Sequence, residues 1–470
     1  MYEVRFDTVI RNGNVVSPDS TITADVGVVD GKVACLAAPG SLTDTEKVID
    51  ATGKYVIPGV VDAHVHYHLP FMGSATADDF HTGTIYAAVG GVTSIIDFAI
   101  QKGDEDPLDT ISKRRAEADG KVVVDYCLHA CLTDPSQRTL SRIPAIIEQG
   151  IPSFKVFMVY KKDGWMVDDG LLVDYLKTAA EHGGLIGVHS ESAAMSDYNT
   201  EKAVREGHTE PIYHSITKNN LTEAEAINRA LFIARSLGSP IYDFHMSVRE
   251  GVEMFRQSRS QGLPFYAETC PRYLALTDEC LKKPDGHNWI CSPPLRSQED
   301  IGVLWEGIRD GSISVVASDH CAYSAAQKAA RKESFEKVPN GFEGVGVLLP
   351  VTFTEGVKRD RISINRMVSV LCANPAKIFG LYPRKGVIAP GGDADIVVMD
   401  PDTEKTISAK TIALGIDWSP FEGLKTTGWP TVTMSRGKIV AENGKFVGTK
   451  GYGTFLKRSI PQEVLSGPIC

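Results

Sequence analysis

Apolar and polar positions follow two alternating patterns through most of the chain. Short runs rich in β-branched and aromatic residues, such as Tyr55–Val61 and Pro240–His245, are typical of buried strands. Between such runs lie stretches with helical periodicity, of which Thr222–Leu237 is a clear example. Repeated strand–helix units predict an α/β fold with a parallel sheet, here a (β/α)8 TIM-like barrel.

Both ends of the chain differ from this pattern. Near the N-terminus, the pattern is typical of hairpin strands at Asp7–Val16, Asp25–Val29 and Val33–Leu36. Near the other end, the same kind of pattern occurs at Ala394–Met399 and Thr431–Met434. Neither end can easily bury its own faces, so we predict that the two join as one composite β-sandwich domain. The expected organisation is residues 1–55 for its first part, 56–382 for the barrel, 383–450 for its second part and 451–470 for a C-terminal tail.

A pair of histidines follows the first barrel-like strand, in Asp62-Ala63-His64-Val65-His66. Alternate strand residues point to the same face, so both imidazoles can bind one metal ion. Imidazole nitrogen suits zinc and related divalent ions. Two histidines at this spacing also arise by chance on a polar face, so the motif needs support from the rest of the chain.

Three later strand-like runs end on further metal-binding residue types. They are Leu185–His189, Pro240–His245 and Ser314–Asp319. Each has a plainer interpretation, because histidines at strand ends are often core residues and an aspartate after serine can cap a helix. Their recurrence at strand C-termini, where barrels of this kind place their chemistry, favours one shared site.

Lys155 lies in the middle of the apolar run Pro152–Tyr160. A buried ammonium is costly unless it is neutralised or paired, although the side chain can also extend outward to water. A neutral lysine amine can add carbon dioxide and become a carbamate, an anionic bidentate ligand. We therefore predict that carbamylated Lys155 bridges two divalent metal ions whose other ligands are His64, His66, His189, His245 and Asp319.

These motifs resemble those of the cyclic amidohydrolases, above all dihydropyrimidinases and D-hydantoinases. The resemblance extends over essentially the whole chain and rests on Asp78–Thr84, Ser153–Lys161, Glu210–His214, Glu268–Leu274, Ser292–Arg296, Ser318–Cys321 and Gly451–Arg458. It implies that His64, His66, Lys155 and Asp319 hold one metal ion and that Lys155, His189 and His245 hold the other. Zn²⁺ is the expected metal, with Mn²⁺, Co²⁺ and Ni²⁺ as alternatives.

The resemblance implies hydrolysis of the cyclic amide bond of dihydropyrimidines or 5-substituted hydantoins, as in pyrimidine degradation. A hydroxide bridging two cations would be the nucleophile, because metals lower the pKa of bound water. Asp319 would carry its proton to the departing nitrogen, and Tyr160 would donate to the developing oxyanion. Tyr160 can alternatively be a rim aromatic with a solvated hydroxyl. Ser292 and Asn340 match positions whose backbone groups bind the imide edge of the ring.

The residues after the first histidine pair help to discriminate among relatives. Dihydroorotases have an arginine where this chain has His68, and allantoinase-like enzymes favour Glu-Pro-Gly in this loop. We therefore predict an apolar pocket with Leu69, Phe71, Phe157 and Trp165 as walls, and a surface or supporting role for His68. Allantoinase or another cyclic imide hydrolase remains the alternative, and the natural substrate, stereopreference and native metal stay open.

A different class of protein must also be considered. Collapsin response mediator proteins resemble this chain and act as scaffolds, but they have lost metal ligands. Each of the predicted ligands is present here, which favours an enzyme over a scaffold.

Charge, hydropathy and cysteine content limit which partners and which compartment we expect. A net charge of −10 argues against nucleic acid or an anionic membrane, and no apolar run approaches a membrane span or a signal peptide. Nine cysteines without close pairing indicate reduced thiols and a cytoplasmic protein. The expected partner is a small cyclic amide. In relatives the C-terminal tail packs on a neighbouring subunit, so the resemblance also implies a homo-oligomer, a tetramer or a dimer.

Overall fold

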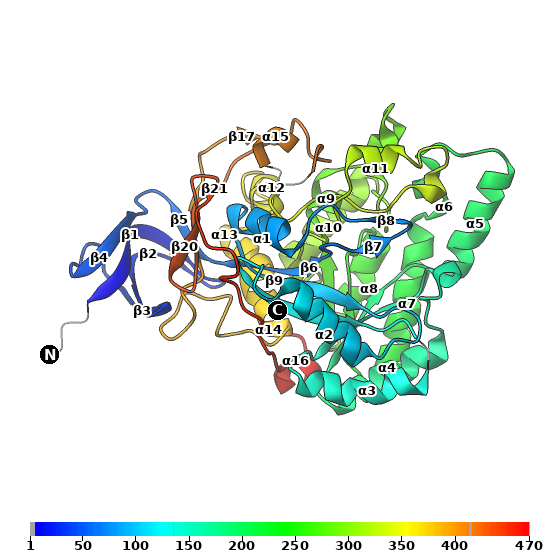
Figure 1. The fold of residues 1–470 in the computed structure, drawn as a ribbon, viewed down its shortest axis with the longest axis horizontal. Coiled ribbons are helices and arrows are strands. Elements are labelled where there is room, and N and C mark those ends of the chain that lie inside the picture. The colour runs from blue at the N-terminus through cyan, green and yellow to red at the C-terminus, as the bar shows by residue number, and fades with distance from the viewer. Residues whose placement is uncertain (1–4, 135, 413–415, 470) are drawn as a thin grey trace.

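Eight parallel strands form the inner wall of the fold in this computed structural model, which describes residues 5–134, 136–412 and 416–469 (Figure 1). In spatial order they are β6 (Val60–Val65), β9 (Val92–Ile100), β10 (Asp125–Cys131), β11 (Ser153–Phe157), β12 (Leu185–His189), β13 (Ile241–Asp243), β14 (Phe265–Thr269) and β15 (Val315–Val316). The wall closes where the backbone N–H of His66 donates to His320 O at 2.7 Å. The predicted barrel is confirmed.

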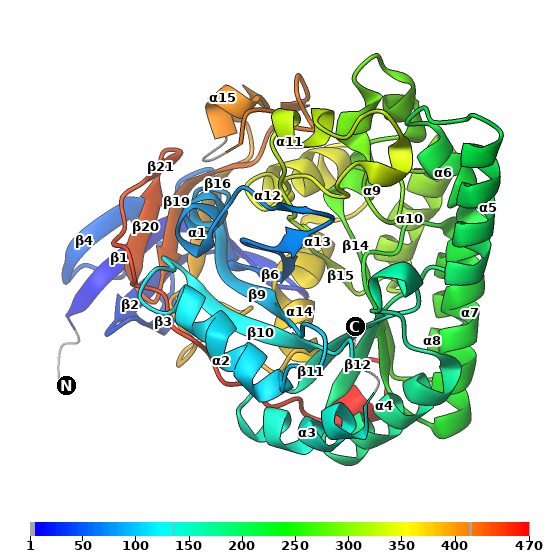
Figure 2. The ribbon, with the colours of Figure 1, turned by 45° about the vertical axis from the view of Figure 1, so that its right-hand side comes forward.

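Helices cover the outside of these strands (Figure 2). The longer ones are α1 (Phe80–Val89), α2 (Pro107–Ala118), α3 (Gln137–Glu148), α4 (Asp169–Glu181), α5 (Ala193–Arg205), α7 (Asn220–Leu237), α8 (Arg249–Ser260) and α10 (Gln298–Asp310). The shorter ones are α6 (Tyr213–Thr217), α9 (Pro271–Ala275), α11 (Ala325–Ala329), α12 (Leu348–Thr352), α13 (Ile364–Val368), α14 (Asn374–Ile378), α15 (Ala409–Ile412) and α16 (Gln462–Ser466). The helix predicted at 222–237 is α7, which begins earlier because the Asn219 side chain caps it by accepting from Leu221 N. Within the described ranges no helix is both long enough and apolar enough to cross a membrane.

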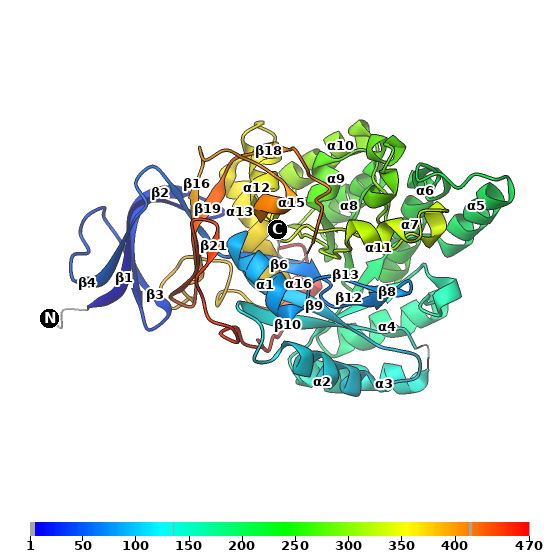
Figure 3. The same cartoon turned by 45° about the horizontal axis from the view of Figure 1, so that its top comes forward.

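The two ends of the chain combine in a single nine-stranded sheet (Figure 3). One end supplies β1 (Phe6–Val16), β2 (Thr21–Val29), β3 (Lys32–Ala37), β4 (Thr45–Asp50) and β5 (Tyr55–Pro58), and the other supplies β16 (Ile396–Asp400), β19 (Trp429–Ser435), β20 (Lys438–Glu442) and β21 (Lys445–Phe446). Antiparallel pairing of β5 with β16, with Ile57 opposite Val397, joins the halves. The predicted union of the two ends is confirmed, and the chain passes into the barrel at Gly59, just after the expected boundary at residue 55. Two small hairpins complete the strands, β7 (Pro70–Phe71) with β8 (Ser74–Ala75) and β17 (Lys405–Thr406) with β18 (Lys425–Thr426).

Two tight turns help to set the register of this sheet. Asp30 and Gly31 have φ angles of 49° and 74°, and Arg436 and Gly437 have 44° and 76°. Two successive left-handed residues are what a type I′ hairpin turn requires, and glycine adopts that conformation readily. The turns also touch each other, because a Cβ on Gly437 would lie 2.8 Å from the Cα of Gly31. Glycine is therefore needed for packing as well as for conformation.

The C-terminal tail runs along the chain's own barrel. Tyr126 in β10 accepts from Leu456 N at 2.8 Å and donates to Thr454 O at 3.0 Å. Arg458 is buried and donates to Ser153 Oγ at 2.9 Å. The tail therefore packs against the barrel of its own chain, and the expected contact with a neighbouring subunit stays a prediction.

Candidate metal centre

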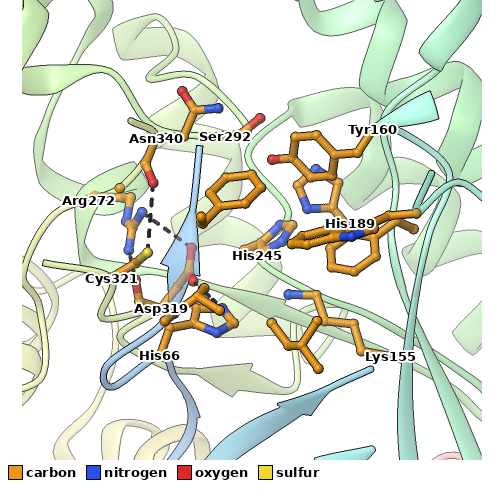
Figure 4. A pocket seen from close by; sticks show the side chains of 16 residues that line it. His66, Lys155, Tyr160, His189, His245, Arg272, Ser292, Asp319, Cys321 and Asn340 are labelled. Carbon is orange, nitrogen blue, oxygen red and sulfur yellow. Dashed lines mark hydrogen bonds and ion pairs between the residues drawn. The ribbon is translucent and has the colours of Figure 1, made fainter. Parts of the chain in front are cut away.

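The predicted metal ligands lie together at the C-terminal rim of the barrel. Figure 4 labels His66, Lys155, His189, His245 and Asp319 around one pocket. They come from β6, β11 and β12 and from the segments that follow β6, β13 and β15. All are buried, with at most 8% of any of these residues exposed; the set is His64, His66, Lys155, His189, His245 and Asp319. Because parallel barrel strands all end on the same rim, residues far apart in sequence share one pocket here.

His64, His66 and Asp319 form the tightest group. The two Nε2 atoms of the histidines are 3.1 Å apart, and Asp319 Oδ1 lies 3.2 Å from His64 Nε2 and 3.5 Å from His66 Nε2. Tetrahedral zinc with Zn–N bonds of about 2.0–2.1 Å sets neighbouring ligand atoms about 3.3–3.4 Å apart. The observed spacings fit donors that surround one cation.

Glu268 fixes which nitrogen of His64 faces this group. Its Oε1 is 2.7 Å from His64 Nδ1 and also accepts from His245 N at 3.3 Å. Because Oε1 is thus an acceptor, Nδ1 of His64 carries the proton. The neutral ring then presents the Nε2 lone pair to Asp319, and burial lowers the pKa of His64 well below its usual value. Two acceptors facing each other repel unless a cation lies between them. The donor set therefore fits a metal ion.

Lys155 lies beside the same group. Its Nζ is 3.1 Å from His64 Nε2 and faces the rings of Phe98 and Phe244, whose centroids are 4.6 and 4.8 Å away. None of the described carboxylates forms an ion pair with it. Burial lowers the pKa of Lys155 and so favours the uncharged amine. The outward, solvated alternative for this side chain is wrong.

His189 and His245 lie together in the same pocket. Their ring centroids are 4.4 Å apart, and His189 Nε2 is 2.7 Å from Glu191 Oε2. That contact leaves His189 Nδ1 as the free lone pair. The Nδ1 atom of His245 is buried without a hydrogen-bond partner among the described residues. Burial lowers the pKa of both rings, which keeps them neutral as metal ligands must be.

Arg272 controls the charge of Asp319. An Nη1 atom of Arg272 lies 3.3 Å from Asp319 Oδ2, and a second nitrogen donates to Ser318 O at 2.9 Å. Burial works to raise the pKa of Asp319, but the Arg272 guanidinium is the main opposing influence and that pKa lies well below its usual value. The carboxylate is therefore ionised at neutral pH and can ligate a cation or accept a proton.

Three predicted site residues have an unusual backbone. Tyr160, His245 and Asp319 have φ angles of 64°, 45° and 45°, in the left-handed region that residues with a Cβ rarely adopt. Each follows a barrel strand by two or three residues, where the chain must turn sharply. Strain of this kind gathers at functional sites because the surrounding structure holds it in place.

The rest of the pocket is lined by an aromatic wall and by polar loops. Phe71 stacks on Trp165 at 5.1 Å, and Phe157 lies 5.3 Å from Trp165. Tyr160 is half-buried between this wall and the predicted metal ligands, and desolvation followed by Glu191 raises the pKa of its hydroxyl. The pocket is also lined by Leu69, Ser292 and Asn340, as predicted, whereas His68 is exposed and lines a neighbouring cavity instead.

Sequence reasoning assigned no role to Glu191, Glu268 or Arg272. Glu191 lies two residues after His189, and Glu268 is a charged residue within an apolar strand run, as Lys155 is. For Glu268, a charged residue within an apolar strand run was therefore the available signal. Glu268 contacts His64 across 204 residues of sequence, so no local pattern could identify its partner.

The sequence profile described as the amidohydrolase family matches residues 55–440. The chain belongs to the amidohydrolase family. It is 41% identical to the D-hydantoinase of Geobacillus stearothermophilus over 454 residues, which cover 96% of both chains. It is 41% identical to the D-hydantoinase of Streptomyces coelicolor over 462 residues, which cover 97% of this chain and 98% of that one. The crystal structure of dihydropyrimidinase from Brevibacillus agri has a TM-score of 0.94 at 40% identity and covers 96% of this chain and 98% of its own.

These likenesses confirm the assignment to the cyclic amidohydrolases that the motifs predicted. They extend over nearly the full length of both partners, so the amidohydrolase barrel and the terminal sheet are both shared. The prediction of an enzyme is confirmed with them.

Proposed function

We propose that this amidohydrolase opens the ring of dihydropyrimidines, 5-substituted hydantoins or both and releases N-carbamoyl amino acids. The main support for this proposal is the group formed by His64, His66 and Asp319. Their donor atoms lie within 4.8 Å of one another, beside the buried Lys155. The names of the relatives, D-hydantoinase and dihydropyrimidinase, support the choice of ring.

Two divalent metal ions would be held in this pocket. His64, His66 and Asp319 would hold one ion, His189 and His245 the other, and a carbamate on Lys155 would be shared. The lowered pKa of Lys155 supports the carbamate, because only the uncharged amine adds carbon dioxide. Nitrogen and oxygen donors suit Zn²⁺ and also Mn²⁺, Co²⁺ or Ni²⁺. Bound metal ions would supply Lewis-acid polarisation of the scissile carbonyl and a lowered pKa for the attacking water.

The chain's own residues move the proton and bind the ring. Asp319, kept ionised by Arg272, accepts a proton from the attacking water and delivers it to the departing ring nitrogen. The raised pKa of Tyr160 keeps its hydroxyl protonated, so it donates to the carbonyl oxygen as charge develops there. Backbone groups of Ser292 and Asn340 bind the imide edge on the other side of the pocket.

The aromatic wall sets the substituent that the pocket accepts. Phe71, Phe157 and Trp165 pack against one another and present an apolar surface, with Leu69 beside them. An apolar or aromatic group on the ring therefore fits better than a carboxylate. One such contact discriminates by about 1–3 kcal/mol, so changing Leu69 to Ala should shift preference among substituted rings and leave unsubstituted dihydrouracil comparatively unaffected.

A panel of rings tests this function directly. Metal-loaded protein is mixed with dihydrouracil, dihydrothymine, allantoin, dihydroorotate and both enantiomers of an aryl-substituted hydantoin, and ring opening is followed by absorbance. We expect turnover of dihydropyrimidines or hydantoins, with dihydroorotate excluded. Preference for allantoin would support the alternative hydrolase, and turnover of none of these rings would contradict the proposal.

We further propose a cytoplasmic homo-oligomer. The eight cysteines that the structure describes are free thiols, as is usual in a reducing compartment. Tyr198, Leu221 and Phe232, on α5 and α7, are more than half exposed, and apolar surface of this kind is commonly covered by another subunit. Light scattering of the purified protein gives the mass, and a monomer would contradict the assembly.

A further inference from the structure

Lys328 has no exposed surface and no acidic partner among the described residues. It lies in the short helix α11, and its Nζ donates to two backbone carbonyls, Ile290 O at 2.8 Å and Pro339 O at 3.0 Å. The rings of Phe342 and Trp418 flank the same nitrogen at 5.8 and 6.0 Å. Burying an amine here is costly, and hydrogen bonds in such apolar surroundings are correspondingly strong.

The two carbonyls belong to the loops that line the ring-binding side of the pocket. Ile290 lies two residues before Ser292, and Pro339 immediately precedes Asn340. Ile290 O also accepts from Gly341 N at 3.1 Å, so the two loops meet directly at one oxygen. Gly341 has a φ of 125°, and a Cβ there would lie 2.7 Å from Cys321 O, so the meeting point is closely packed. Loops distant in sequence are thus held as one unit.

We propose that Lys328 is a positioning residue for ring recognition, which sets the spacing between the Ser292 and Asn340 backbones. This inference rests on the proposed function, in which those backbone groups bind the imide edge of the ring. An amine bridges two acceptors because it carries at least two N–H bonds. Burial lowers the pKa of Lys328 to about 7, and both its charged and its neutral form can make the bridge.

Lys328→Met tests the bridge because methionine keeps the length and apolar character of the stem but cannot donate. Lys332→Met is the matched control, since Lys332 is an exposed lysine just after α11 and undergoes the same substitution. Two inhibitors separate the two sides of the pocket. Succinimide presents a cyclic imide edge to the loops, whereas acetohydroxamate binds metal ions.

We expect Lys328→Met to raise KM and to weaken succinimide inhibition, each by about tenfold or more. This magnitude is typical of a buried carbonyl that loses its hydrogen-bond donor. Metal content and acetohydroxamate inhibition should stay as in the wild type, kcat should fall less than KM rises, and Lys332→Met should change nothing. Should the methionine variant fail to fold, Lys328→Gln retains an N–H donor and should show the same selective change at smaller size.

The inference would be overturned if Lys328→Met kept the wild-type KM and the wild-type succinimide inhibition and only its Tm fell. Lys328 would then have a merely structural role. Equal loss of succinimide and acetohydroxamate inhibition would also overturn it, because the metal side would then be disturbed. Failure of the proposed function gives a different result, since the wild type itself would then open neither hydantoins nor dihydropyrimidines.

Discussion

Replacing Glu268 by glutamine tests whether a carboxylate orients His64 toward a metal ion. Glu268 Oε1 accepts from His64 Nδ1 at 2.7 Å and from His245 N at 3.3 Å, and Oε2 accepts from Tyr242 Oη at 2.9 Å. Glutamine has nearly the same shape and keeps one acceptor oxygen, and Tyr242 can turn its hydroxyl to accept from the new amide. The fold should therefore persist, while the side chain behind His64 can no longer ionise.

The magnitude follows from these contacts. Glu268 is fully buried, and burial raises its pKa well above the usual value. A cation bound by His64 would favour the carboxylate form, and hydrogen bonds to charged groups contribute about 1.5–3 kcal/mol. Partners that orient metal-bound histidines typically change metal affinity or activity by about 10–100-fold, or roughly 1.4–2.7 kcal/mol. We expect Glu268→Gln to weaken one metal-binding step by that amount.

Competition with a chromophoric chelator measures both metal-binding steps. Glu191→Gln is the matched comparison, because Glu191 contacts His189 at 2.7 Å as Glu268 contacts His64. Each variant should weaken a different step and leave the other near its wild-type affinity. Wild-type affinity at both steps in Glu268→Gln would refute the orienting role of this carboxylate.

Three further predictions concern proton transfer, the oxyanion and pH. Asp319→Asn should lower kcat by about 10²–10⁴-fold with far less loss of bound metal, measured by metal analysis beside turnover; metal loss in step with activity would make Asp319 mainly a ligand. Tyr160→Phe should lower kcat by about 10²-fold or more with little change in KM, and full turnover would remove its role as a donor. Burial lowers the pKa of His66 to about 4, below the unfolded value of about 6.5, so the folded state binds fewer protons between those values. The metal-free protein should therefore lose stability in urea as pH falls from about 6.5 to about 4, and a constant midpoint across that window would contradict this.

The clustering of the proposed metal ligands could be predicted because their signals are local. Strand alternation places His64 and His66 on one face, and the apolar runs before His189, His245 and Asp319 mark strands whose ends share one rim. The structure brings all of them together at that rim. The same reasoning predicted the joining of the chain ends, because neither hairpin set could bury its faces alone.

The supporting residues could not be predicted because their partners are remote. Glu268 orients a histidine from another strand, and Lys328 bonds to main-chain oxygens that carry no sequence signal of their own. The left-handed backbone conformation at Tyr160 likewise could not be predicted from the sequence, since tyrosine has no preference for that conformation. Tertiary contacts determine the partner of Glu268, the partners of Lys328 and the backbone conformation of Tyr160.

A carbamate on Lys155 is the most specific feature of the proposed metal centre. Metal-free protein is reconstituted with zinc in the presence of ¹³C-labelled bicarbonate, and the labelled carbon is measured by ¹³C NMR beside metal content and turnover. We expect one labelled carbamate per chain, gained together with metal and activity, and none in Lys155→Arg, whose guanidinium cannot form the ligand. Active, metal-loaded wild type without the labelled carbon, or full turnover in Lys155→Arg, would contradict a metal centre built on this lysine.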